Sequence, residues 1–479
     1  MQARRRIAIV GLMAWVATAA APVHGAVFTV TTNAAAGPGS LRQAIDDANA
    51  SEGIDTIAFA IPEPQCSASG VCTIHLGTSP AALTGPVIVD GTTQPRYGTA
   101  PENVCATADA PSYMRVEITV PDIEDFVFQL DSAAGPTAST FRGVALAGGR
   151  SLRIYAAGAH RVQCNHLGVN GPGTALLDTV PHLWNPPTVD GVTIEGSGQG
   201  VIVGTDGDGV DDVSERNVMG AGGTGVNVNA NSNNVIAGNF IGLGADGVTP
   251  LGETLGIFMR QSSGANRVGT DFDGVSDELE RNVIGNCYSG VGLYEYGSAN
   301  AIVGNWIGVD ANGAPAANVR GIFLSDSGAG RLIDYNRIES NTTGIEIDAG
   351  SAGTLDPDSR GNCFAANGTG FAHGGTAAIA FESNWWGAAD GPSGTGPGSG
   401  DAVTVSGSGS IDFTPWETNG CPAPEPGELA AASVAGAALA FVSRAERRRR
   451  TLRNRAPDGA ASGPRACGRG CGAHPEELT

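Results

Sequence analysis

One short phrase recurs six times between residues 191 and 347, and it limits the folds open to this chain more than any other feature. The phrase consists of a glycine, an aliphatic residue, any residue and a second aliphatic. Its copies are G-V-T-I at Gly191, G-V-N-V at Gly225, G-I-F-M at Gly256, G-V-G-L at Gly290, G-I-F-L at Gly321 and G-I-E-I at Gly344. One strand-like phrase per period is typical of repeat proteins whose units stack on a continuous core.

The spacing of the copies indicates the shape of each unit. Successive copies start 34, 31, 34, 31 and 23 residues apart, and residues 203–220 match residues 268–285 at 13 of 18 positions. Short strands joined by Asn and Gly suit a three-sided coil, because these residues adopt left-handed turn conformations at little cost. Repeated Asn residues can also form amide ladders between coils. We therefore predict an all-β parallel β-helix, with regular and closing coils over 191–420 and irregular coils over 61–190. The longer periods carry loops of roughly 8 to 12 residues outside the stack.

The start of the chain after residue 25 predicts a short helix. Residues 40–43 read S-L-R-Q, which has the S-x-x-Q form of a capping box, and apolar residues follow at helical spacing. A solenoid needs its open end covered, since an exposed strand edge pairs with other chains. We expect residues 26–60 to form an N-terminal cap that contains this helix.

The same region resembles a known family. V-F-T-V at Val27 and G-S-L-R-Q-A-I at Gly39 are similar to the CSLREA-type N-terminal motif of bacterial surface proteins, with Gly39 in place of the leading cysteine and Gln43 in place of the glutamate. D-G-T-T-Q-P at Asp90 and N-W-W-G at Asn384 are similar to further segments of those proteins. The resemblance implies a right-handed parallel β-helix, and it brings no catalytic signature that matches positions in this chain.

Both ends of the chain have the form of processing signals. Three arginines and an apolar run make residues 1–25 a secretory signal. Residues 421–450 contain P-E-P, an apolar run and four arginines, and resemble the PEP-CTERM sorting signal. That resemblance implies a sorting protease of the exosortase type, a transient membrane anchor and display on the surface of a Gram-negative bacterium. We expect residues 451–479 to be a disordered tail.

The charge balance excludes one class of partner. All 27 basic residues are arginine, and residues 27–426 hold 43 acids against 15 arginines. Such a surface repels phosphate backbones, so we expect no nucleic-acid partner. Divalent cations or neutral sugars suit it better, so we expect a polysaccharide or cell-surface glycans as partners, and we expect a monomer.

The cysteines predict one disulfide and leave the others open. Cys66 and Cys72 are close enough in sequence to close a small loop in an oxidising compartment. The pairing of the remaining cysteines cannot be read from their spacing, and the odd count before residue 422 leaves one over.

The middle residues of the phrase predict a binding surface. Side chains alternate along a strand, so the two aliphatics of each copy face the core and the residue between them faces outward. One outward column contains Thr193, Asn227, Phe258, Gly292, Phe323 and Glu346, and its neighbour contains Glu195, Asn229, Arg260, Tyr294, Ser325 and Asp348. The side chains best suited to bind a glycan are Asn227, Asn229, Phe258, Arg260, Tyr294 and Phe323. The alternative is a solvated sheet face with ordinary strand aromatics.

A catalytic role on this scaffold rests on two acids. Glu346 and Asp348 face the same way two residues apart, roughly 6.5 to 7 Å by strand rise, which is close to the separation in inverting glycosidases. A lyase would need Arg260 as its base, because the chain has no lysine. Two surface acids without a catalytic role are the competing interpretation. We therefore expect a binding or structural module, with a polysaccharide lyase or glycoside hydrolase as the alternative on the same fold.

Two duplicated acidic loops predict a metal site. Asp206, Asp208 and Asp212 recur as Asp271, Asp273 and Asp277, around a glycine turn. Three carboxylates at such spacing could converge on Ca²⁺, which prefers oxygen ligands, although the EF-hand pattern is not met. The alternative is a solvated turn copied along with the repeat. His160, His166 and His182 have no partner spacing and are interpreted as structural or surface residues.

Overall fold

The computed structural model describes residues 25–422, apart from 123–124, 132, 134, 136, 178–189, 221–222, 262, 296 and 326–327. The secretory signal, nearly all of the sorting segment, the C-terminal tail and His182 lie outside these residues. Within them, no helix is long and apolar enough to cross a membrane.

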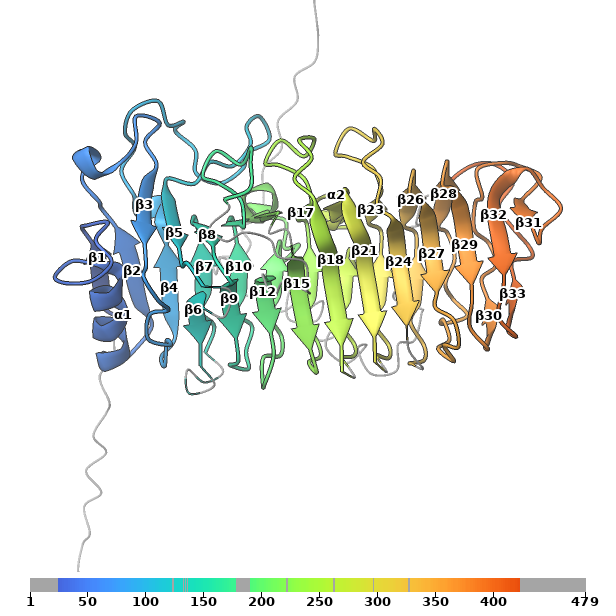
Figure 1. Ribbon diagram of the computed structural model, residues 1–479, viewed down its shortest axis with the longest axis horizontal. Coiled ribbons are helices and arrows are strands. Elements are labelled where there is room, and N and C mark those ends of the chain that lie inside the picture. Colours follow the sequence, from blue (N-terminus) through green and yellow to red (C-terminus); the bar gives the residue numbers. More distant parts are fainter. Residues whose placement is uncertain are drawn as a thin grey trace, which may run out of the picture. The chain divides into compact units, whose positions relative to one another are not determined.

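Three parallel sheets form the sides of the solenoid (Figure 1). In chain order, sheet A contains β1 (Val27–Val30), β2 (Asp55–Phe59), β4 (Val87–Asp90), β7 (Thr140–Arg142), β10 (Arg161–Gln163), β13 (Ile202–Gly204), β16 (Val235–Ala237), β19 (Arg267–Gly269), β22 (Ala301–Val303) and β25 (Leu332–Asp334). Sheet B contains β3 (Cys72–His75), β5 (Val116–Thr119), β8 (Ala145–Ala147), β11 (His166–Leu167), β14 (Val218–Met219), β17 (Phe240–Ile241), β20 (Val283–Ile284), β23 (Trp306–Ile307), β26 (Arg337–Glu339) and β28 (Cys363–Ala365).

Sheet C contains the strands of the repeated phrase. They are β6 (Phe126–Leu130), β9 (Arg150–Ile154), β12 (Asp190–Ile194), β15 (Thr224–Asn229), β18 (Glu253–Arg260), β21 (Cys287–Tyr294), β24 (Arg320–Ser325), β27 (Thr343–Ile347), β29 (Thr369–His373), β31 (Pro392–Gly394) and β32 (Gly400–Val405). A small sheet pairs β30 (Ala378–Ala380) with β33 (Ser410–Asp412). From β4 to β27 the chain passes from A to B to C and then returns to A one coil further on, which confirms the predicted parallel β-helix.

The phrase has a physical reason at each of its positions. Its aliphatic residues all belong to the continuous core, and each is at most 2% exposed. Its glycine lies against the next coil: a Cβ on Gly225 would stand 2.6 Å from the carbonyl oxygen of Gly256, and the other copies meet their neighbours in the same way. Any larger residue would push two coils apart, so the phrase must begin with glycine.

The predicted amide ladders are present. Along the longest, each side-chain Nδ2 donates to the Oδ1 of the next asparagine over 2.9 to 3.1 Å. Its members are Asn165, Asn217, Asn239, Asn282, Asn305, Asn336, Asn362 and Asn384, all fully buried. A second ladder runs through Asn318, Asn341 and Asn367 and ends on Asp401. The ladders satisfy amides that would be costly to bury alone.

The predicted N-terminal helix is α1 (Leu41–Ala50). The Ser40 side chain accepts from the backbone N–H of Gln43, as expected for a capping box. The reciprocal bond is not formed, because the Gln43 side chain donates to Asp47 one turn later. Asn49 bonds to the backbone at residues 82 and 84, which lead into the first complete coil. The helix is confirmed, and its role as a cap stays a prediction.

The irregular region and the disulfides complete the picture. Residues 61–190 carry strands of the same three sheets, joined by longer loops and by the 3-10 helices η1 (Glu63–Gln65) and η2 (Gly91–Thr93). The helical turn α2 (Asp277–Glu280) lies further along the chain. The Cys66–Cys72 disulfide is formed as predicted. The structure adds Cys105–Cys164 and Cys363–Cys421, and it leaves Cys287 as a buried thiol.

Candidate functional site

The three outer faces of the solenoid differ in what covers them. Loops 205–217 and 270–282 follow strands of sheet A, and each loop contains one of the two acidic triads. Side chains on the outside of sheet B, including Phe240, pack beneath Leu243 and Ala316 from the following loops. The outer face of sheet C carries the two predicted columns between β12 and β27, and we call the residues of these columns the strip.

The strand register confirms the predicted columns. Asn227, Phe258, Gly292, Phe323 and Glu346 are direct partners on successive strands. Asn229 pairs with Arg260, and Tyr294 pairs with Ser325. A fixed register follows from the buried aliphatics on either side, because a slip of one residue would turn them out of the core.

The exposure of the strip differs from the expectation. Thr193, Asn227 and Phe323 are only 3%, 7% and 4% exposed, and the other strip side chains are partly buried. They do face away from the core, but they cover one another. The strip is therefore a packed outer face whose side chains are only partly accessible.

Three aromatic rings form a continuous cluster on this face. The Phe258 and Tyr294 ring centroids are 4.7 Å apart and the Tyr294 and Phe323 centroids 5.2 Å apart, both edge to face. Tyr294 reaches this position because Gly292 leaves room for its ring. A Cβ at Gly292 would lie 2.8 Å from Cε2 of Tyr294. Gly292 thus positions the middle ring of the cluster.

An arginine covers the C-terminal part of the cluster. The guanidinium carbon of Arg320 lies 4.1 Å from the Phe323 ring centroid and 5.2 Å from that of Tyr288. Its Nε donates to Glu346 over 2.9 Å. Tyr288 is 49% exposed and presents the most open aromatic surface near the strip. Sequence reasoning missed it because it precedes the phrase, although β21 begins before the phrase does.

The opposite part of the strip contains unsatisfied polar atoms. Arg260 lies beside Phe258, 5.6 Å from the ring centroid, and its Nε is buried without a hydrogen-bond partner. The Oδ1 atoms of Asn227 and Asn229 are also buried without a donor. Burial raises the pKa of Tyr294 to about 12, so its hydroxyl stays protonated and can donate at neutral pH.

The two acids predicted as a catalytic pair are engaged with their neighbours. Glu346 is ion-paired with Arg320, and both side chains are about a quarter exposed. Asp348 accepts hydrogen bonds from the Ser325 hydroxyl and from the backbone N–H of Ala349. Each acid therefore has a structural partner on the strip.

The acidic loops bring their predicted residues together. In each loop, one carboxylate oxygen from each of the three aspartates lies within 4.8 Å of the others. The same carboxylates accept bonds from their own loop: Asp212 from the Thr205 hydroxyl and the Gly209 N–H, and Asp208 from the Val210 N–H. The second loop repeats this pattern. Calcium stays a prediction, since the loop contacts alone account for the positions of the aspartates.

Two glutamates that the sequence did not single out as site residues hold these loops. Glu215 accepts the N–H of Asp206, and Glu280 accepts that of Asp271, each over 3.0 Å. Burial raises the pKa of both carboxyls to about 7. Glu280 is 1% exposed and pairs with Arg267 over 3.1 Å. The glutamates thus act as internal acceptors for the loops.

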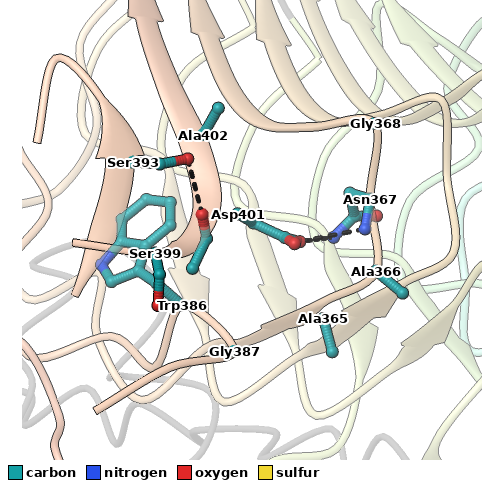
Figure 2. Close-up of a pocket in the computed structure, with 11 residues that line it drawn as sticks. Ala365, Ala366, Asn367, Gly368, Trp386, Gly387, Ser393, Ser399, Asp401 and Ala402 are labelled. Atoms are coloured by element: carbon teal, nitrogen blue, oxygen red, sulfur yellow. Dashed lines mark hydrogen bonds between the residues drawn. The ribbon is translucent and has the colours of Figure 1, made fainter. Parts of the chain in front are cut away.

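A pocket of about 290 Å³ lies near the C-terminal end of the described coils (Figure 2). Its lining includes Asn367, Trp386, Ser393, Ser399 and Asp401. Asp401 accepts from both the backbone N–H and the Nδ2 of Asn367, as Figure 2 shows, and burial raises the pKa of its carboxyl. The sequence did not single out this pocket, because its walls come from separate coils.

His160 and His166, the described histidines that the sequence singled out, are structural. His166 is fully buried between the Ser112 hydroxyl and the Asn170 carbonyl, and burial lowers its pKa to about 4. His160 is also fully buried, and burial lowers its pKa. Among the described residues, groups of three His, Cys, Asp or Glu side chains that could hold a metal are the two aspartate triads, and neither contains His or Cys.

The match to one family profile supports the fold. Residues 183–371 match the family profile described as periplasmic copper-binding protein (NosD). The A-module of the mannuronan C-5 epimerase AlgE6 from Azotobacter vinelandii aligns with 83% of this chain and 100% of that chain, at 11% identity and a TM-score of 0.32. No curated protein matches the chain.

The similarity to NosD covers the coils that carry the strip and the acidic loops. Copper sites favour imidazole and thiolate or thioether ligands. The described residues do not fit such a centre, because Met114, Met219 and Met259 lie in apolar clusters, the described cysteines other than Cys287 form disulfides, and the two described groups that could hold a metal consist of aspartates. The chain is thus similar to NosD in the stacked coils of a right-handed parallel β-helix.

Proposed function

We propose that this protein is a secreted binding module that holds a glycan on the strip of sheet C. The observation that carries the proposal is the strip itself, where aromatic, guanidinium, amide and hydroxyl groups stay in register over successive coils. Binding sites combine apolar and aromatic surface with a few placed polar groups, and this face has both.

Tyr288, which lies beside the strip, offers an aromatic surface that suits the apolar face of a sugar ring. Tyr288 is half exposed, and the exposed Val319, which immediately precedes β24, donates its N–H to the carbonyl of Cys287 next to Tyr288. The ring cluster beneath Arg320 holds this surface in place, so little order is lost on binding. The protonated Tyr294 hydroxyl and the Asn229 amide supply hydrogen bonds for sugar hydroxyls.

Charge and location agree with this role. The acidic balance of the chain argues against a nucleic-acid ligand. The family description of NosD names the periplasm, which agrees with export of this chain by its N-terminal signal. We propose that a protease of the exosortase type processes the C-terminal segment and that the β-helix is then displayed at the cell surface as a monomer.

The test is a glycan array, followed by calorimetry of the best ligand with the mature secreted protein. We expect the Tyr288→Ala variant to bind at least about tenfold more weakly, because it loses the open aromatic surface. Val248→Ala, which removes an exposed residue from another loop, should bind like the wild type. If no glycan binds, the proposal fails. Release of reducing ends or unsaturated products, lost in Glu346→Gln or Arg260→Ala, would assign a hydrolase or lyase activity instead.

A further inference from the structure

We infer that the part of the strip on β15 and β18 binds an acidic sugar, meaning a ring that carries a carboxylate or a sulfate ester beside free hydroxyl groups. The inference rests on the proposed glycan-binding function and names the class of ligand. It concerns Asn227, Asn229, Phe258 and Arg260, and it follows from the polar atoms that these residues leave unsatisfied.

Arg260 lacks the acidic partner that Arg153 and Arg320 have on this face, and Arg150 on β9 likewise has a buried Nε without a partner among the described residues. Arg153 is ion-paired with Glu195, and Arg320 is ion-paired with Glu346. In the described part of the chain, the Arg260 side chain makes no hydrogen bond or ion pair, and its guanidinium lies against the Phe258 ring. A partly buried guanidinium without an acceptor costs free energy, and a carboxylate or sulfate can bind its planar fork through two hydrogen bonds.

The orientation of Asn227 is fixed by its surroundings. Its Nδ2 donates over 2.9 Å to the Asp190 carboxylate, which also receives the Thr193 hydroxyl. Its Oδ1 therefore points elsewhere, and this atom is buried without a donor although the residue is only 7% exposed. A buried acceptor of this kind is costly to leave unpaired.

Asn229 extends the same pattern to the second column. It is the direct strand partner of Arg260, and its Oδ1 is likewise buried without a donor. The site thus lacks an anion at Arg260 and hydrogen-bond donors at two amide oxygens nearby. A neutral sugar supplies hydroxyl donors but leaves the guanidinium without an anion, and a simple anion leaves the amides unpaired. An acidic sugar supplies both.

The acidic balance of the whole chain limits the length of the ligand. The formal net charge of −21 repels a long polyanion. At physiological ionic strength, charges beyond about 8 Å are largely screened, so Arg260 can still act on an anion in direct contact. The ligand class is therefore a short acidic segment or a chain end.

The experiment is isothermal titration calorimetry of the mature secreted protein with three short oligosaccharides. These are an oligogalacturonate, its carboxyl-reduced neutral form and a sulfated oligosaccharide of similar length. We expect at least one acidic ligand to bind about tenfold or more tightly than the neutral form, since a charged pair contributes more than a neutral hydrogen bond. Binding of only the carboxylate or only the sulfate form would support the proposal and identify the anion.

Variants separate the role of Arg260 from general effects. Arg260→Gln should remove the preference for the acidic ligand, and Arg260→Lys should restore part of it, because it keeps the charge without the fork. Arg96→Gln, which changes an exposed arginine that pairs with Glu102, is the matched control and should bind like the wild type. Melting curves of all variants check that each is folded.

Two results would overturn the inference, and only the second of them would also overturn the proposed glycan-binding function. Equal binding of acidic and neutral ligands, unchanged in Arg260→Gln, would refute the acidic-sugar site while glycan binding itself remains. Absence of binding by all three ligands and by the glycan array would refute both proposals.

Discussion

The acidic loops of sheet A and the strip of sheet C belong to the same coils, yet their polar groups are satisfied to different extents, although Gln163 Nε2 and Arg267 Nε on sheet A are also buried without a partner among the described residues. On sheet A, the carboxylates of the acidic loops accept bonds from their own backbone, and Glu280 is paired with Arg267. On sheet C, Arg260 and the amide oxygens of Asn227 and Asn229 lack partners among the described residues. A polar group that is satisfied within the fold stabilises it, whereas several unsatisfied groups gathered on one outer face are groups that a ligand can complete. The comparison favours sheet C as the binding face.

The largest expected effect tests whether the groups on sheet A are structural. Glu280→Gln removes the shorter of the two ion pairs of Arg267 and leaves Asp271 at 3.8 Å, and breaking a buried pair of this kind costs roughly 3 kcal/mol. We expect chemical denaturation at pH 8 to show this loss of unfolding free energy, with glycan binding by the folded protein unchanged. Glu278→Gln in the same helical turn is the control, with a change near zero. Weaker glycan binding in the folded variant would break the distinction between the faces.

The next effect lies on sheet C and combines stability with binding. Gly292→Ala places a methyl group against the Tyr294 ring, and overpacking costs about 2 kcal/mol. We expect a lower melting temperature and several-fold weaker glycan binding, because the aromatic cluster is displaced. Gly85→Ala, where a Cβ meets nothing within 4 Å, should change neither. Normal binding by Gly292→Ala would show that the ring cluster is dispensable.

A smaller effect concerns Asp401, a buried acid that is held by the amide ladder. Burial raises the pKa of its carboxyl, so the folded state binds a proton more readily than the unfolded state. Its contribution to stability is therefore complete at low pH and is lost as pH rises through the folded-state pKa. Asp401→Asn keeps the acceptor for Asn367 and removes the charge, so we expect about 1 kcal/mol higher stability at pH 7. Denaturation at pH 4 and pH 7 measures this, and equal gains at both would contradict it.

The smallest expected effect concerns calcium. The loop carboxylates already accept internal hydrogen bonds, so we expect EDTA and then millimolar Ca²⁺ to shift the melting temperature by less than about 1 °C. Differential scanning fluorimetry measures the shift. A rise of several degrees with Ca²⁺, lost when Asp208 and Asp273 are both changed to Asn, would establish the metal site that the sequence predicts. Sheet A would then also carry a ligand site, and the distinction between the two faces would be weaker.

The sequence predicts the fold well because the phrase encodes its own register. The aliphatics must face the core and the glycine must meet the next coil, so the columns of outward residues follow directly. The ladders follow in the same way, because each coil repeats its asparagine at the same place.

The state of each outward side chain could not be predicted in this way. That Tyr294 turns over Gly292 depends on the space that a glycine two residues earlier in the same strand leaves for the ring. That Arg320 pairs with Glu346 while Arg260 stays unpaired depends on contacts between coils. Tyr288 escaped attention because its strand extends beyond the repeated phrase, and the Asp401 pocket forms from segments with no shared motif.

Hydroxyl-radical footprinting of the protein with and without its glycan tests the central claim most directly. Tyr288 is half exposed on sheet C, and Val210 is 63% exposed on an acidic loop of sheet A, so both should be oxidised in the free protein. We expect the glycan to protect Tyr288 and leave Val210 unchanged. Protection of Val210 with continued oxidation of Tyr288 would contradict the assignment of sheet C as the binding face.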